Sequence, residues 1–232
     1  MSEADWTELD NSLSGATIKR GPTAGVTKPN GGGTHCNVYN SLATTQGVSG
    51  VFHNGTDFAP LAKGGDAAMA MQRAPSGGGT NFAVFVFIGL GGTDVGDAGY
   101  ILGLADGNPA HIVLRKGILT EGLPDVAPGT QGILRRSTET VAIGTYTHLK
   151  LEMVVNGNGD VVLNCYKSDL GAHVVSTPTW VAIPGMDQFI DDFAGINSGS
   201  VPYTSGYIGH AFWSSDVTRR AYTDHFLPNR QL

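Results

Sequence analysis

The sequence is poor in charged residues and has no long hydrophobic run. Asp, Glu, Lys and Arg make up 15% of the 232 residues, whereas about 25% is typical of globular proteins. No stretch reaches about 18 consecutive apolar residues, so we expect neither a transmembrane helix nor a membrane partner. The first residues lack a basic segment followed by an apolar one, which predicts that there is no signal peptide.

Cysteine is scarce as well, since Cys36 and Cys165 are the two cysteines of the chain. They lie far apart in the sequence, and no His or Cys stands at zinc-ligand spacing from either. Cys165 also belongs to an apolar alternation with Val161 and Leu163. We therefore expect two free thiols, no disulfide and no zinc.

Basic residues form no cluster of the kind that grips phosphates. The net charge is −6, from 14 basic and 20 acidic residues. The densest basic stretches are isolated pairs, such as those at 19–20, 135–136 and 219–220. A nucleic-acid-binding face needs a larger basic patch, so no nucleic-acid partner is expected.

Glycine, in contrast, is abundant. The chain has 34 Gly and a hydrophobic content of 41%, which together indicate a packed core joined by many turns. Short segments with a two-residue alternation follow one another between Gly-, Asn- and Pro-rich turns. The expected strands are 49–53, 67–73, 82–90, 100–105, 111–115, 148–155, 161–166, 206–213 and 219–226.

The prediction rests mostly on three of these segments. Residues 82–90 are apolar at odd and even positions alike, which is typical of a central strand buried on both faces. Residues 148–155 and 161–166 flank the turn Asn156-Gly157-Asn158-Gly159 and form the clearest hairpin, because Asn-Gly supplies a positive φ at low cost. With few helical candidates, at 3–13 and 186–193, the predicted fold class is all-β, a two-sheet antiparallel sandwich.

The N-terminal part differs from the rest. Residues 14–35 are rich in turn formers and poor in large apolar side chains. We expect residues 1–35 to form a short helix and an extended arm, and residues 36–232 to form the sandwich. The arm would dock on a partner subunit, because its prolines limit the entropy lost on ordering. The predicted contact residues are Trp6, Lys19, Arg20, Pro22, Lys28 and Pro29.

No catalytic set is apparent. None of the five Glu has a second carboxylate two positions away on the same strand face, and Glu152 has Lys150 as its same-face neighbour, which indicates a surface ion pair. Nucleophile-elbow and phosphate-loop motifs are absent. The Asp-rich loops 94–97 and 106–108 offer calcium-type oxygens, but such turns commonly form without metal. The prediction is a non-enzymatic protein with no cofactor and no metal.

Three stretches resemble the concanavalin A-like (laminin-G-like) jelly roll over residues 80–226. They are Tyr100–Leu104 with His111–Arg115, then Gly144–Glu152 with the following hairpin to Tyr166, and last Gly206–Phe212 with the ending Tyr222-Thr-Asp224-His-Phe226. The Glu-x-Asp-x-Glu strand of the family's hydrolases is missing here. The resemblance implies a jelly-roll sandwich with an extended N-terminal arm.

The overall layout is also similar to that of tailed-bacteriophage virion proteins built on this jelly roll. This resemblance implies a structural virion protein, such as a capsid decoration protein, that contacts capsid or other virion subunits or further copies of itself. The protein would be made in the host cytoplasm and then carried in the virion. The alternative is a lectin-like carbohydrate-binding module, in which exposed aromatic rings would stack on a glycan. The candidate rings are those of Trp180, Tyr203 and Trp213.

Overall fold

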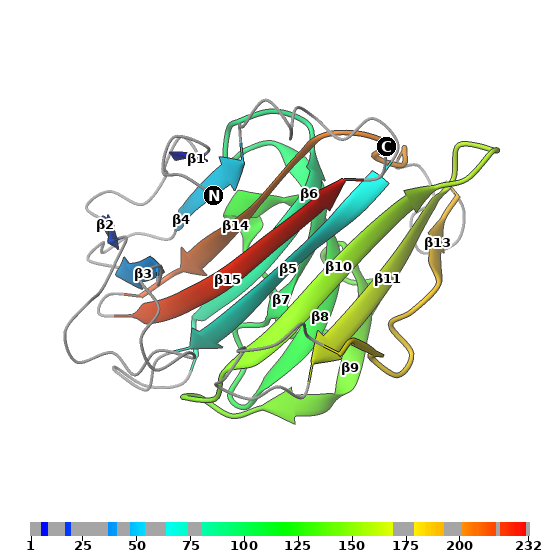
Figure 1. Cartoon of the computed structure of the whole chain (residues 1–232). Helices are drawn as coiled ribbons and strands as arrows, with labels where there is room; N and C mark the ends of the chain where they lie inside the picture. The colour runs from blue at the N-terminus through cyan, green and yellow to red at the C-terminus, as the bar shows by residue number, and fades with distance from the viewer. Residues whose placement is uncertain are drawn as a thin grey trace.

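A computed structural model shows a sandwich of two antiparallel sheets (Figure 1). It describes residues 6–8, 17–19, 37–40, 47–53, 64–73, 80–168, 179–192, 201–216 and 219–230. Within these residues there is no α-helix and no helix long and apolar enough to cross a membrane. The predicted all-β fold class is confirmed.

The strands follow the turn-punctuated pattern of the sequence. In chain order they are β1 (Trp6–Glu8), β2 (Thr17–Lys19), β3 (Asn37–Asn40), β4 (Gly47–His53), β5 (Gly64–Arg73), β6 (Phe82–Leu90), β7 (Ala98–Leu104), β8 (Ala110–Ile118), β9 (Ile133–Val141), β10 (Thr147–Val155), β11 (Val161–Ser168), β12 (Val181–Ala182), β13 (Phe189–Asp191), β14 (Tyr207–Ser214) and β15 (Arg220–Arg230). A 3-10 turn, η3 (Leu119–Glu121), follows β8.

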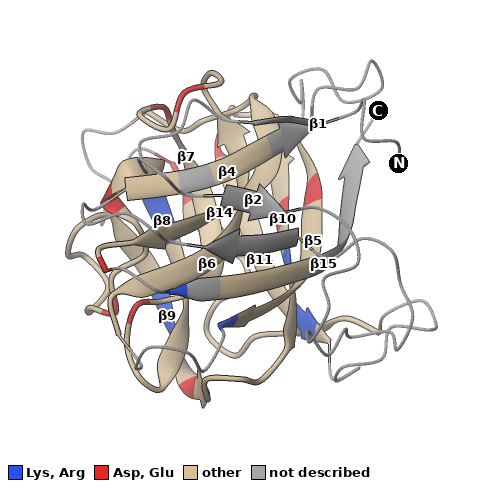
Figure 2. Cartoon of the chain, turned by 90° about the vertical axis from the view of Figure 1, so that its left-hand side faces the viewer, with Lys and Arg blue, Asp and Glu red and all other residues tan. Residues whose placement is uncertain are grey.

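The strand order alternates between distant parts of the chain, as in a jelly roll. The seven-stranded sheet runs β1-β4-β14-β6-β7-β8-β9. The eight-stranded sheet runs β12-β11-β10-β5-β15-β3-β2, with β13 pairing on β11. Figure 1 looks onto the eight-stranded sheet, with the other sheet behind it. In the side view of Figure 2, acidic and basic residues of the described part are interspersed.

β6 is the central strand that its composition predicts, because all of its residues are buried. Val84, Val86 and Ile88 face the core between the two sheets. Phe85 and Phe87 face a second cluster, on the other side of the seven-stranded sheet, which includes Leu119 of η3. The segment after β8 therefore covers the second face of β6, and the strand has no solvated side.

The β10–β11 hairpin has the predicted strands and the predicted turn between them. Val155 pairs with Val161, and the register continues to His148 with Ser168. The Asn156 N–H donates to the Asp160 carbonyl at 3.0 Å, and the Asn156 Oδ1 accepts from the Asp160 and Asn158 N–H groups. The positive φ falls at Gly159, where it is 87°, rather than at Gly157. The turn thus closes around the Asn156 side chain.

Both predicted helices are wrong where the structure describes them. Within residues 3–13, the described residues form β1, which pairs with β4. Within residues 186–193, Phe189 and Asp191 are buried while Ile190 between them is exposed, and the three residues form β13. Pairing with a neighbouring strand satisfies the backbone of these short segments, which are too short to be stable as isolated helices.

The predicted arm falls largely outside the described residues. Four of its predicted contact residues lie outside the described part, namely Arg20, Pro22, Lys28 and Pro29. For Trp6 and Lys19 the structure describes the backbone. Trp6 pairs with His53 in the seven-stranded sheet, and Lys19 pairs with Val38 in the eight-stranded sheet. These two positions belong to strands paired within the same chain, and contact of the arm with another subunit stays a prediction.

A buried ion pair joins the two sheets. Lys116 of β8 lies 2.6 Å from the Asp191 carboxylate of β13, and their side chains are 3% and 0% exposed. The Tyr100 hydroxyl of β7 donates to the same Asp191 oxygen at 2.5 Å. Burial, followed by the hydrogen bond with Asp191, raises the pKa of Tyr100 far above its ordinary value. The phenol is therefore a permanent donor to Asp191.

Replacing Asp191 by Ala is expected to destabilise the protein severely. The Lys116 ammonium would stay buried without its carboxylate, and removing one member of a buried pair typically costs about 3–5 kcal/mol. Denaturant unfolding followed by circular dichroism measures the change. The control is Glu139→Ala, because Glu139 is 46% exposed and pairs with the surface residue Lys167, so its loss costs about 0–1 kcal/mol. Equal losses for the two variants would contradict this role of Asp191.

Candidate functional site

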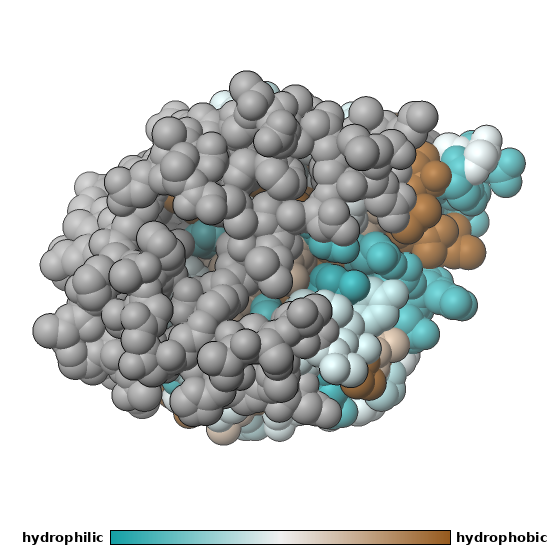
Figure 3. All heavy atoms as spheres, viewed as in Figure 1, coloured by the Kyte–Doolittle hydropathy of each residue, from teal (hydrophilic) through white to brown (hydrophobic). Residues whose placement is uncertain are grey.

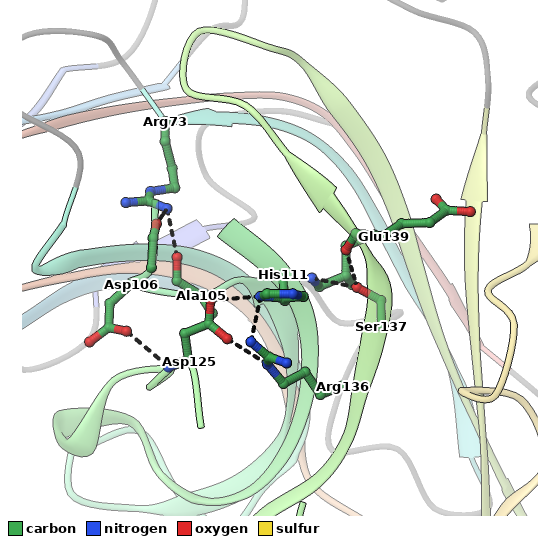
Figure 4. A network of polar contacts seen from close by, with 10 residues as sticks. Arg73, Ala105, Asp106, His111, Asp125, Arg136, Ser137 and Glu139 are labelled. Atoms are coloured by element: carbon green, nitrogen blue, oxygen red, sulfur yellow. Dashed lines mark hydrogen bonds and ion pairs between the residues drawn. The ribbon is translucent and has the colours of Figure 1, made fainter. Parts of the chain in front are cut away.

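A network of polar side-chain contacts surrounds Asp125, in the segment between η3 and β9 (Figure 4). Its carboxylate contacts His111 Nδ1 at 2.8 Å and Arg136 Nε at 2.6 Å. Its N–H donates to Asp106 Oδ1 at 2.9 Å, and Arg73 donates to the Ala105 carbonyl at 2.8 Å. Burial raises the pKa of Asp125, but the hydrogen bonds from His111 and Arg136 outweigh it and hold the pKa below its usual range.

The contacts of this network indicate a structural role. A His–Asp pair catalyses acyl transfer only when it activates a nucleophile. The nearby Ser137 hydroxyl instead accepts from the Ile112 N–H at 3.0 Å and donates to the Glu139 carbonyl at 2.6 Å. Both oxygens of Asp125 are occupied. The network therefore ties the β7–β8 hairpin to β9 and to the segment that covers β6.

The Asp-rich loop 94–97 uses its carboxylates on its own backbone, and Asp106 of the second loop accepts from the Asp125 N–H. Asp94 Oδ1 accepts from the Gly96 N–H at 2.6 Å, and Asp97 Oδ2 accepts from the Asp94 N–H at 2.8 Å. Among the described residues, no three His, Cys, Asp or Glu side chains gather in a way that could hold a metal ion. Cys165 is a free, buried cysteine, and Cys36 lies outside the described residues.

The three aromatic residues proposed to stack on glycans lie in three different places. Trp213 is 6% exposed, belongs to the second cluster, and donates its indole N–H to the Thr120 carbonyl at 3.0 Å. Tyr203 is partly buried against the main core, with its ring 5.3 Å from that of Tyr100. Packing therefore accounts for the position of Trp213, while Tyr203 is partly exposed and a stacking role for it stays a prediction.

Trp180 lies on the outward face of the eight-stranded sheet. It comes just before β12, whose Ala182 pairs with Tyr166 of β11. Its ring meets the His148 ring edge-on, with the centroids 4.7 Å apart. Because Leu149, Leu151 and the other alternate residues of β10 face the core, His148 marks the outward side of that strand.

Four cross-strand rows make up the side of β10 and β11 that faces away from the core, which we call the outer strip. The first row, His148 with Ser168, is buried at 3% and 7% exposure, and the other three rows are half-buried. His148, Lys150, Glu152 and Val154 stand on β10, opposite Ser168, Tyr166, Asn164 and Val162 of β11. Trp180 lies beside the first row, and Ile190 of β13 pairs with Val162 in the last. Successive rows are about 7 Å apart, twice the rise per residue of a strand. The outer strip consists of His148, Lys150, Glu152, Val154, Val162, Asn164, Tyr166, Trp180 and Ile190.

The middle of the outer strip is a hydrogen-bonded polar group. Glu152 Oε2 accepts from Asn164 Nδ2 at 2.9 Å and from the Tyr166 hydroxyl at 3.2 Å. Asn164 Oδ1 accepts in turn from the Gln188 N–H at 2.9 Å. Burial and then the Glu152 carboxylate raise the pKa of Tyr166 to about 12. The surface ion pair expected between Glu152 and Lys150 is replaced by these bonds, which hold the carboxylate against β11.

The strip offers three kinds of contact in sequence. Trp180 and Tyr166 present half-buried aromatic rings, Glu152 and Asn164 present fixed polar groups, and Ile190, at 52% exposure, ends the strip with an apolar surface. Figure 3 shows hydrophilic residues beside a hydrophobic patch on this side of the sheet. Aromatic rings with planar polar neighbours suit a ligand that has both apolar faces and hydroxyl edges.

Sequence reasoning identified Trp180 and missed the rest of the strip. The signal was present in the alternation itself, because the positions of β10 and β11 that do not face the core carry two cross-strand polar pairs and a tyrosine. The contribution of β12 and β13 had no comparable signal, since each has three residues or fewer.

The chain matches no protein-family model, and no curated protein sequence matches it. Solved structures do match over nearly its whole length. The carbohydrate-binding module CBM66 from Bacillus subtilis superposes with a TM-score of 0.50 at 11% identity, covering 94% of this chain and 97% of that one. The cellulose-induced protein Cip1 gives 0.53 at 13% identity, with 98% and 92% covered.

A carbohydrate recognition domain of Emp46p gives a TM-score of 0.50 at 9% identity, covering 98% of this chain and 88% of that one. At such identities the likeness concerns the fold. It confirms the jelly-roll sandwich expected from the sequence. The matched structures are carbohydrate-binding proteins by name in two of these three cases, and none of the three is a virion protein by name.

Changing Glu152 to Gln is expected to lower the pKa of Tyr166 from about 12 toward its ordinary value of 10.0. The Tyr166 pKa should not fall all the way to 10.0, because burial is the largest cause of its rise and is unchanged in the variant. A tyrosine pKa that is raised on folding stabilises the folded state at pH values below the ordinary pKa. This stabilisation is lost as the pH rises through the pKa of the folded state. NMR titration of ring-labelled tyrosine measures both pKa values. Glu121→Gln, outside the strip, should leave the pKa unchanged, and an unchanged value in Glu152→Gln would refute the contact.

Proposed function

We propose that the protein is a non-catalytic glycan-binding module and that the outer strip is its binding surface. The observation that carries the proposal is the placement of Trp180 and Tyr166, two half-buried rings, beside the fixed polar pair Glu152 and Asn164 on one outward face. A sugar presents an apolar face to a ring and hydroxyls to polar side chains. The same surface therefore serves both parts of a sugar.

Binding rather than hydrolysis follows from the environment of Glu152. A glycosidase needs two carboxyl groups that flank the bond to be cleaved. The described residues of the strip contain one, and its Oε2 accepts hydrogen bonds from Asn164 and Tyr166. The carboxylate is thus arranged as a hydrogen-bond acceptor for hydroxyl groups.

The names of the matched structures favour this function over a particle-surface role. CBM66 is a carbohydrate-binding module, and the Emp46p domain is a carbohydrate recognition domain. None of the three matched structures named above is a virion protein by name. The virion interpretation stays a prediction from the sequence, and the carbohydrate-binding alternative becomes the main proposal.

Trp180→Ala is expected to weaken glycan binding about tenfold or more, since truncating a central aromatic residue of a binding surface commonly costs above ~1.4 kcal/mol. A glycan array first identifies the bound sugar, and calorimetry then measures the dissociation constant. Trp180→Phe keeps a ring and should retain part of the affinity. Val201→Ala, at an exposed position outside the strip, is the control. Unchanged affinity in a folded Trp180→Ala variant would rule out this surface.

A further inference from the structure

We propose that the outer strip selects glycans whose sugar rings carry a carboxylate, of the uronic acid type, and that Lys150 determines this selectivity. The inference rests on the proposed function and adds the class of ligand to it. The group that decides the selectivity is the Lys150 ammonium.

Lys150 lies between the two aromatic rings of the strip. Its Nζ is 4.3 Å from the centroid of the Tyr166 ring and 5.5 Å from that of Trp180. The side chain is half-buried. Contacts of this kind attract a cation to a ring face by about 0.5–2 kcal/mol. They hold the ammonium at the centre of the surface on which a sugar would stack, without adding negative charge there.

Several other basic residues of the described part pair with carboxylates, whereas Arg135, like Lys150, lies over an aromatic ring, that of Phe189. Lys116, Lys167, Arg115, Arg136 and Arg219 each form an ion pair with a carboxylate. The described residues provide no such ion pair for Lys150, whose contacts there are the two rings. A carboxylate arriving with a ligand would be the first counter-charge of this ammonium within that part of the chain.

Charge on a bound sugar changes the strength of the contact. An ammonium that donates to a carboxylate gains the attraction between two opposite charges, which a bond to a neutral hydroxyl lacks. The gain is larger at a half-buried cation than at one in open water, because the surrounding dielectric is lower. A carboxylated sugar is therefore favoured over its neutral counterpart at this position.

The acidic groups nearby limit how much negative charge the ligand carries. Glu152 is the next outward residue of β10 after Lys150, Asp187 is exposed, and the net charge of the chain is −6. A densely sulfated or phosphorylated polymer would be repelled by these charges. A uronic acid combines one carboxylate, for Lys150, with several hydroxyls, for Glu152 and Asn164. Its charge pattern fits the strip.

Binding of matched polysaccharides tests the inference. The full-length protein is measured by calorimetry against a panel of polyuronates and against the carboxyl-reduced, neutral form of each polymer. We expect at least one polyuronate to bind about tenfold more tightly than its reduced form, a difference of ~1.4 kcal/mol. Added salt should weaken the binding of the polyuronate and leave that of the reduced form nearly unchanged.

Variants at two lysines assign the effect. Lys150→Gln is expected to remove the preference for the carboxylated form, and Lys150→Arg to keep it. Lys167→Gln is the matched control, because Lys167 lies on neighbouring β11 but pairs with Glu139 of β9. Circular dichroism verifies that each variant is folded.

The possible failures are distinguishable. Equal or tighter binding of the neutral forms, lost in Trp180→Ala, overturns the carboxylate selectivity and leaves the proposed function standing. A preference that survives in Lys150→Gln overturns the role of Lys150. Failure of the wild type to bind any polymer of the panel or any sugar of the array overturns both proposals.

Discussion

The register of the β10–β11 hairpin is the constraint on which both the core and the outer strip depend. Leu151 faces Cys165, and Met153 faces Leu163, on the side that meets the other sheet. Because side chains alternate with a period of two, a slip of one residue would turn these groups to solvent and carry Lys150 and Tyr166 toward the core. The burial of the inward row thus fixes the arrangement of the outward row.

The buried ion pair extends this constraint to the edge of the sheet. Asp191 bonds with Lys116 and Tyr100 of the opposite sheet, and Phe189 is buried on the same strand. With these two side chains directed inward, Ile190 between them faces outward and completes the last row of the strip. A polar interaction in the core therefore positions an apolar contact on the surface.

The sequence was sufficient where several residues repeat one pattern. β6, with apolar residues at odd and even positions, and β10 with β11, with strict alternation, were predicted because burial of a whole face dictates the side-chain type at every second position. β1 and β13 were predicted wrongly as helices. Three residues hold too little pattern to decide, and their strand conformation depends on partners that are distant in the chain.

The candidate site was predictable in part for the same reason. Trp180 was selected by residue type, but Trp213 shares that type and is packed in the interior, and Tyr203 is partly buried against the main core. Exposure, which tertiary packing decides, separates Trp180 from Trp213. The grouping of Trp180 with His148 and Lys150 requires that β12 pairs with β11, and no local signal encodes that pairing.

The central claim is that a glycan binds on the outer strip, and the tryptophan side chains can report on it directly. The chain has three Trp, of which Trp180 lies on the strip and Trp213 in the interior. The measurement is an NMR titration of the labelled indole N–H signals with an oligosaccharide that the protein binds. The account predicts that the Trp180 signal shifts in proportion to saturation while the Trp213 signal stays in place. Saturable binding that leaves the Trp180 signal unmoved would contradict it.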